Sequence, residues 1–301
     1  MGTPFISFLE PSKLDGYDKT KPHDQQGSHI PRVFVDVMEL REGLWSKEQR
    51  QSFENQIDAD DARSCHWVVY ASVNETVEPE VRDEDGNVMR PRKSCTRNTP
   101  AGAIRLVPFP HGPLPKAGGR YDNGQLIDEK DGKPSEASST GSTASMDRPT
   151  TFYDGREPYV KLGRLIVAKE FRGFGLSGLL VHTVLSWLKA KPAFFDPSIT
   201  ELGFEQIGAS NETEMAKWGG LICVHAAENA AGSWKKWLFD LDPEMGKWWD
   251  NGVPTVALFK RLQLKDDREE EEREKEQGKG KKKEEEEEEK GKGKMKEKVG
   301  D

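Results

Sequence analysis

The chain has 301 residues, of which 34% are hydrophobic and 33% are charged, and its formal net charge is −8. So low a hydrophobic share predicts that part of the chain lies outside any core. The sequence has no run of about 18 apolar residues, so we expect no membrane-spanning helix. The three cysteines, Cys65, Cys95 and Cys223, are far apart and form no CxxC pair, which argues against a disulfide framework and a zinc site. We therefore expect no metal and a reducing compartment, the cytoplasm, with the nucleus as an alternative.

Composition divides the chain into a body and polar appendages. We expect an N-terminal extension over residues 1–29 and one domain over 30–264, with polar insertions at 74–99 and 109–158. Residues 265–301 are almost wholly Glu, Lys, Arg and Gly, which predicts a disordered tail. The body is mildly acidic. This charge argues against a nucleic-acid partner and favours cationic substrates such as amines.

Apolar periodicity predicts alternating helices and strands in the body. A helical pattern begins at Val33 and continues to Gln56, and another begins at Leu176. Strand patterns cover residues 66–71, 100–107, 162–168, 221–226 and 252–259. These elements predict an α/β chain.

The segment with the strongest functional signal joins the strand at 162–168 to the helix that begins at Leu176. A charged turn between them carries Arg172, Gly173 and Gly175. Glycines allow close approach of the backbone to a phosphate, and a helix start directs unpaired N–H groups and a positive dipole end at the same place. The segment therefore predicts an anion cradle.

Gly173 to Gly178 spells GxGxxG, which leaves a dinucleotide-binding oxidoreductase as one alternative. That fingerprint needs a strand that leads directly into the first glycine and an acidic residue about 20 positions on, after a second parallel strand. Here residues 169–172 intervene, and no such strand closely follows the helix. The context disfavours this alternative.

The same turn, written as Arg172-x-x-Gly175-x-Ser177 after the LxV of Leu165 and Val167, resembles the central motif [RQ]xxGx[GA] of the GNAT superfamily of acyl-CoA N-acyltransferases. Serine replaces the usual glycine or alanine and is still small. Residues 32–71, with RVFVxxxE at residues 32–39, an acidic loop and HWVVYA, look like the amino-terminal half of bacterial and fungal GNAT proteins of unassigned substrate. Residues 100–107 are similar to the superfamily's third strand.

The resemblance implies a GNAT fold: a central mixed, mostly antiparallel, twisted sheet of about six or seven strands, flanked by helices. It implies that acetyl-CoA is the cosubstrate and that an amine, either a small molecule or a protein amino group, is the acceptor. The residues that would hold acetyl-CoA are Leu165, Ile166, Val167, Arg172, Gly173, Phe174, Gly175, Leu176, Ser177, Gly178 and Asn229.

Direct acyl transfer needs no protein nucleophile, so the sequence is searched for a general base. The candidates are His225, Glu170 and His66, and Asp58 and Asp60 compete with them.

The helix after the fifth strand, residues 226–237, resembles a family pattern that ends in a tyrosine acid, but Trp234 stands at that place. An indole cannot supply a proton at neutral pH. A catalytically silent module that binds coenzyme A or a protein partner is therefore the alternative to an active N-acetyltransferase.

Overall fold

The computed structural model describes residues 4–44, 56–122, 124–127, 147–196 and 217–264. It divides the chain into two compact units, Met1–Leu262 and Gln263–Asp301. The fold below is that of the first unit. The expected tail and the last part of the helical pattern that was expected to reach Gln56 lie mainly outside the described residues.

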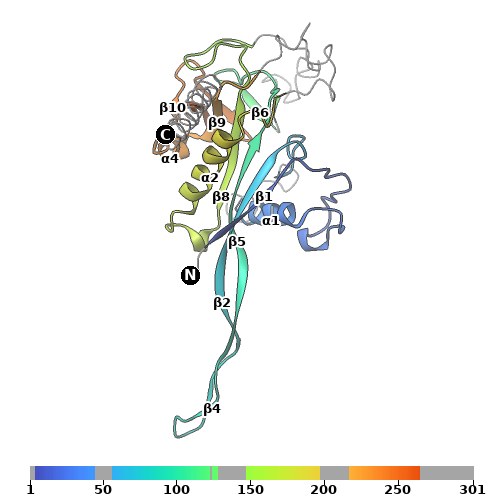
Figure 1. The fold of residues 1–301 in the computed structure, drawn as a ribbon, viewed down its shortest axis with the longest axis vertical. Helices are drawn as coiled ribbons and strands as arrows, with labels where there is room; N and C mark the ends of the chain where they lie inside the picture. The colour runs from blue at the N-terminus through green and yellow to red at the C-terminus, as the bar shows by residue number, and fades with distance from the viewer. Residues whose placement is uncertain (1–3, 45–55, 123, 128–146, 197–216, 265–301) are drawn as a thin grey trace, which may run out of the picture. The chain divides into compact units, whose positions relative to one another are not determined.

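The body is built on one ten-stranded mixed sheet (Figure 1). Nine strands follow one another across it in the order β1 (Phe5–Leu9), β2 (Cys65–Glu78), β5 (Lys93–Val107), β8 (Val160–Val167), β9 (Leu221–Ala227), β12 (Val253–Arg261), β11 (Lys247–Asp250), β6 (Arg120–Asp122) and β7 (Gln125–Leu126), and β10 (Asp240–Leu241) pairs with β12. Most pairs are antiparallel, and β8 and β9 form a parallel pair near the centre. The expected fold class is confirmed, with more strands than the six or seven expected.

Three of the additional strands come from segments that the sequence assigned to appendages, whereas β10 and β11 lie in the body, between the expected strands at 221–226 and 252–259. β1 lies in the expected N-terminal extension and pairs with β2 over five residues. The short strands β6 and β7 lie in the expected insertion at 109–158.

Helices cover both faces of the sheet. Val37 and Leu40 of α1 (Arg32–Arg41) pack against Val68 of β2 and Ile166 of β8. Side chains alternate between the faces of a strand, so Trp67 points the other way. It contacts Trp187 of α2 (Leu176–Ala190) with 5.4 Å between ring centroids. None of the helices in the described ranges is long and apolar enough to cross a bilayer.

β2 and β5 extend past the rest of the sheet as a two-stranded ribbon (Figure 1). β1 pairs with β2 only up to Tyr70, and β8 pairs with β5 only from Gly102 onward, so the ribbon beyond these points holds only its own cross-strand pairs. The strands β3 (Val81–Arg82) and β4 (Val88–Arg90) continue it as a separate small sheet. The polar insertion expected at 74–99 is therefore an ordered ribbon.

The segment before β8 contributes to the core. Leu114 and Tyr153 pack with Cys223 of β9, Trp248 of β11 and Phe259 of β12. This cluster covers the face of the sheet that carries the odd-numbered residues of β9, and that face includes His225.

Candidate functional site

The parallel strands β8 and β9 separate after two residues of pairing. Their register contains only Val160 opposite Ile222 and Lys161 opposite Cys223. Beyond these pairs β8 stays bonded to β5, and β9 stays bonded to β12. The facing edges of residues 162–167 and 224–227 therefore have no shared ladder and offer backbone N–H and C=O groups to a ligand. We call this opening the wedge.

The wedge begins at an irregularity in β8. Arg164 has a left-handed backbone, with φ of 51°, and the pairing of β8 with β5 shifts register between Ala103 and Arg105. A register shift of this kind bends the strand and redirects its side chains. The bend coincides with the point at which β8 leaves β9.

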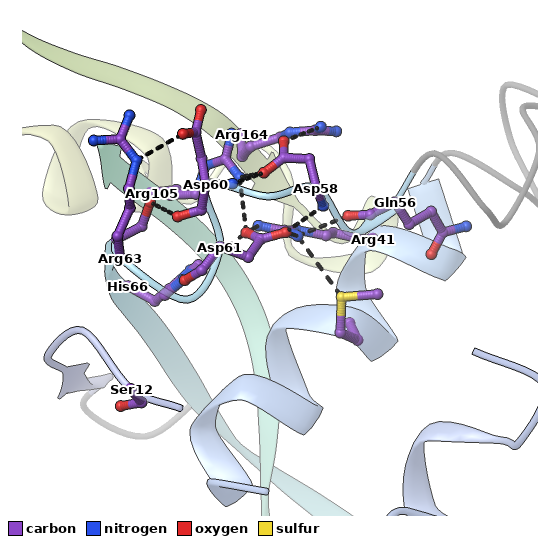
Figure 2. A network of polar contacts seen from close by, with 12 residues as sticks. Ser12, Arg41, Gln56, Asp58, Asp60, Asp61, Arg63, His66, Arg105 and Arg164 are labelled. Carbon is purple, nitrogen blue, oxygen red and sulfur yellow. Dashed lines mark hydrogen bonds and ion pairs between the residues drawn. The ribbon is translucent and has the colours of Figure 1, made fainter. Parts of the chain in front are cut away.

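An ion-pair network holds this irregular stretch of β8 against the loop before β2 (Figure 2). Asp58 accepts hydrogen bonds from Arg105 at 2.6 Å and from Arg164 at 2.9 Å. Asp61 accepts from both guanidinium nitrogens of Arg41, at 2.9 and 2.8 Å, and from Arg105 at 2.8 Å. Asp60 pairs with Arg63 at 2.8 Å. The network ties α1, the loop, β5 and β8 into one unit.

The charges of the network shift the pKa values of its acids. Burial alone would raise the pKa of Asp58, but the attraction of Arg105 and Arg164 outweighs it and lowers the pKa to about 2. For Asp61 burial is likewise outweighed, by Arg41 and Arg105, and its pKa lies well below the ordinary value. Both carboxylates are therefore ionised at neutral pH.

At its other end the wedge leads to the glycine turn. The chain passes through a short 3-10 helix, η5 (Lys169–Phe171), and then Gly173 and Gly175, with φ of 85° and 76°. A side-chain carbon added at either glycine would find no atom of the described residues within 4 Å. Both glycines therefore leave an open surface beside the start of α2.

The start of α2 has unsatisfied donors. Gly175 is its N-cap, no side chain caps it, and the N–H of Leu179 bonds to the carbonyl of Gly175 at 3.1 Å. The N–H groups of Leu176, Ser177 and Gly178 precede that bond and have no helical acceptor. With the dipole of a 15-residue helix behind them, they form a site suited to an anion such as a diphosphate.

The residues assigned to acetyl-CoA from the sequence lie around this path. Ten of them follow one another along β8, the turn and the first turn of α2, and Asn229 lies on η7 (Glu228–Ala230), directly after β9. Phe174 and Asn229 are exposed, and Leu176 is buried. Ile166 is only 1% exposed and packs toward α1, so only its backbone faces the wedge.

His225 lies on β9, and its side chain is on the face of the sheet that Trp248 covers. Its ring centroid is 4.9 Å from that of Trp248, and its buried Nε2 has no hydrogen-bond partner among the described residues. Burial, followed by the positive charge of Lys161, holds the pKa of His225 well below its ordinary value. A neutral imidazole with a free nitrogen is able to accept a proton.

The other two candidate bases occupy different environments. His66 is 1% exposed, and its Nε2 lies 3.0 Å from the carbonyl oxygen of Asp61. Burial lowers the pKa of His66 to about 4. Glu170 is exposed on η5. If the parallel register of β8 and β9 is continued, His225 lies opposite Gly163, which is seven residues before Glu170 in the chain. The structure therefore does not bring the three candidates together.

Sequence reasoning missed three polar residues: Lys161 and His111, which interact with His225, and Arg164, at the irregularity in β8. Lys161 and Arg164 lie on β8, and His111 lies in the segment between β5 and β6, where its Nε2 is 2.9 Å from the carbonyl oxygen of Tyr159. A charged residue within the apolar strand pattern of β8 was the available signal for Lys161 and Arg164. Nothing in the loop-like composition around His111 pointed to it.

The dinucleotide alternative finds part of its context. β8, α2 and β9 form a parallel strand, helix and strand unit. However, η5 separates β8 from the glycines, and the acidic residue that follows β9, Glu228, comes 53 positions after Gly175 rather than about 20. The unit lacks the spacing of the fingerprint.

The structure has the mixed, mostly antiparallel sheet flanked by helices that the sequence resemblance implied, together with a separated parallel pair and a glycine turn. No protein-family model and no curated protein matches the sequence.

Solved structures similar to this chain include acyltransferases. An acyl-CoA N-acyltransferase from Pseudomonas aeruginosa is 10% identical with a TM-score of 0.39, and the match covers 86% of this chain and 99% of that one. ElaA from Escherichia coli is 11% identical with a TM-score of 0.38, over 86% of this chain and 100% of that one. NAA60 from Arabidopsis thaliana, solved with acetyl-CoA, is 10% identical with a TM-score of 0.34, over 86% and 99%.

Proposed function

We propose that the chain is an N-acetyltransferase that moves an acetyl group from acetyl-CoA to an amine in a ternary complex. The observation that carries the proposal is the wedge between β8 and β9, which leads directly to an uncapped helix start with two open glycines. An open strand edge suits the amide-containing pantetheine arm, and the helix start suits the diphosphate.

The reaction follows from placing the thioester in the wedge. The neutral amine nitrogen attacks the thioester carbonyl carbon, the C–N bond forms, and the C–S bond breaks. The acetyl group goes to the amine, and the coenzyme leaves as a thiolate that takes up a proton. Unpaired N–H groups at the edge of β8 stabilise the negative charge on the carbonyl oxygen.

His225 is the proposed base. It lies on β9 beside the wedge, and it is neutral at pH 7 because burial and Lys161 disfavour its charged form. It takes the proton that the amine loses. His66 and Glu170 remain candidates with weaker geometry, since His66 faces the network around Asp61 and Glu170 lies beside the glycine turn.

One observation favours a second candidate, a silent module that binds coenzyme A. Trp234 of α4 (Ala231–Lys235) occupies the position where relatives are expected to carry a tyrosine, and it is 5% exposed and packed on Trp237 and Phe239. It supplies no proton to the leaving thiolate. The leaving thiolate, whose conjugate thiol has a pKa of about 8.5, can take its proton from the ammonium product or from water, so this position does not prevent transfer.

Two measurements test the proposal in sequence. Calorimetric titration with acetyl-CoA should show saturable binding, and NADH should show none. Thiol release with acetyl-CoA and a panel of amines, amino acids, amino sugars and peptides should then identify an acceptor, and the rate of release should fall by about 10²-fold or more in His225→Phe. Tight acetyl-CoA binding without thiol release across the panel favours the module, whereas absent acetyl-CoA binding by folded protein defeats both.

A further inference from the structure

A lysine at the inner end of the wedge has no ionic partner among the residues that the structure describes. Lys161 is partly buried on β8, opposite Cys223 of β9, at the last residue pair before the two strands separate. Burial lowers the pKa of its ammonium, although the nearby carboxylate of Asp60 acts in the opposite direction. Within the described part of the chain, no carboxylate lies within 4 Å of its Nζ.

The acids that influence Lys161 already have other partners. Asp58 is bonded to Arg105 and Arg164, and Asp60 is paired with Arg63. Asp250, at the end of β11, accepts a hydrogen bond from the side chain of Asn251 at 3.2 Å, and burial raises its pKa. A buried ammonium without a close counterion is costly, and an anionic group of a ligand would remove that cost.

Two proton acceptors lie beside this lysine. Its charge lowers the pKa of both His225 and His111, although for each histidine burial is the larger cause. The Nε2 of His111 faces the carbonyl oxygen of Tyr159 and therefore holds the hydrogen, so its Nδ1 is left with a lone pair. That Nδ1 and the Nε2 of His225 are buried, and neither has a partner in the described ranges.

A cation without a counterion next to two nitrogens without partners is complementary to a molecule that bears both a carboxylate and an amine. We infer that the acceptor is an amine that carries a carboxylate, an amino acid or a molecule of that type, and that Lys161 binds its carboxylate. His111 and His225 then face the amine, and His225 takes its proton in the proposed transfer. The inference rests on the proposed function and narrows its acceptor from amines in general.

The overall charge of the chain favours the opposite choice, since a formal net charge of −8 attracts purely cationic amines. Residues 265–301, with 16 acidic and 13 basic residues, carry −3 of that charge, whereas Lys161 lies where β8 and β9 meet. Contacts within a water-poor site outweigh a screened long-range field. The local cluster is therefore the better guide to the acceptor.

Sets of three acceptors that share one amine provide the test: an amino acid, its amide and the amine without the carboxylate, such as glycine, glycinamide and methylamine, or lysine, its amide and cadaverine. We expect kcat/KM for thiol release to be at least tenfold higher for the acid than for the amide in the preferred set. The amide has the more easily deprotonated amine, so intrinsic reactivity predicts the reverse order. Lys161→Met should remove the preference, and Lys161→Arg should retain part of it.

A matched control and a second readout separate this inference from the proposed function. Lys93→Met, on the exposed ribbon, should leave the preference intact. If no amine releases thiol, titration of glycine into the protein with acetyl-CoA absent should still shift the imidazole NMR signals of His111 and His225, and methylamine should not. Any of three outcomes overturns the inference: equal kcat/KM for the acid and the amide, an equal loss of kcat/KM for both in Lys161→Met, or a glycine titration that shifts neither imidazole signal. Acetyl-CoA binding, measured in parallel, tests the proposed function separately.

Discussion

Asp58 and Arg164 form a 2.9 Å ion pair that joins the loop before β2 to the one residue of β8 with a left-handed backbone. Arg164 lies at the bend where β8 leaves β9, so the carboxylate of Asp58 braces the strand at the origin of the wedge. A left-handed non-glycine residue costs free energy, and it persists because surrounding contacts fix it. The network around Asp58 therefore serves the site even though it contains none of the proposed reacting groups.

Asp58→Asn should destabilise the body by about 2 kcal/mol, because it removes a partly buried carboxylate that pairs with both Arg105 and Arg164. The free energy of unfolding in urea measures this loss. Glu80→Gln is the control, since Glu80 pairs with Arg82 on the exposed ribbon and should contribute less than about 1 kcal/mol. Equal effects of the two substitutions would show that the network does not brace the strand.

The same pair predicts a defined response to acid. The pKa of Asp58 is lowered to about 2 in the folded chain, from an ordinary value of 3.8. A lowered pKa contributes stability that is complete above the unfolded value and is lost as the pH falls toward the folded value. The difference in unfolding free energy between wild type and Asp58→Asn should therefore be constant above pH 5 and shrink between about pH 4 and pH 2. A difference that persists unchanged to pH 2 contradicts the assigned shift.

The parts of the fold that could be predicted from the sequence are those with one-sided burial. The strands at β2, β5, β8, β9 and β12 and the helix start at Leu176 show the apolar patterns of elements packed on a core. The ribbon of β2 and β5 was taken for a polar insertion because it is exposed on both faces and has no apolar alternation. β1 was missed because five residues near a terminus carry too little periodicity.

The site divides in the same way. The glycine turn could be predicted because its residues are contiguous in the sequence and form a recognisable motif. The environment of His225 is assembled from Lys161 on β8, Trp248 on β11 and His111 in a connecting segment, and only the sheet order brings these together. The register of β8 with β9, which creates the wedge, depends on pairing across more than 50 residues of chain, and no local pattern encodes it.

Gly175→Val should weaken acetyl-CoA binding at least tenfold, about 1.4 kcal/mol, because the new side chain fills the open surface at the helix start. The substitution also strains a left-handed backbone, with φ of 76°. Gly86→Val is the matched control: Gly86 has φ of 83°, has equally open surroundings and lies on the ribbon. Calorimetry should give normal affinity for the Gly86 variant, and normal affinity for both would remove the diphosphate from this turn.

The pH dependence of transfer tests His225 as the base. Attack requires a neutral amine, so log kcat/KM for a simple amine without a carboxylate should fall with a slope of one as the pH decreases below the pKa of the amine. A second unit of slope should appear where His225 becomes protonated. Because burial and Lys161 hold the pKa of His225 well below its ordinary value of 6.5, that break should lie well below pH 6.5.

Lys161→Met removes one of the two causes of this lowered pKa, so the break should move to higher pH in that variant. Because the simple amine has no carboxylate, the two pH profiles are compared without the effect of losing a contact between Lys161 and the acceptor. His225→Phe should show no second break and a rate reduced by about 10²-fold or more. A break that lies at or above pH 6.5 in the wild type, or that Lys161→Met leaves in place, would assign the base to another residue, and His66 would then be the next to substitute.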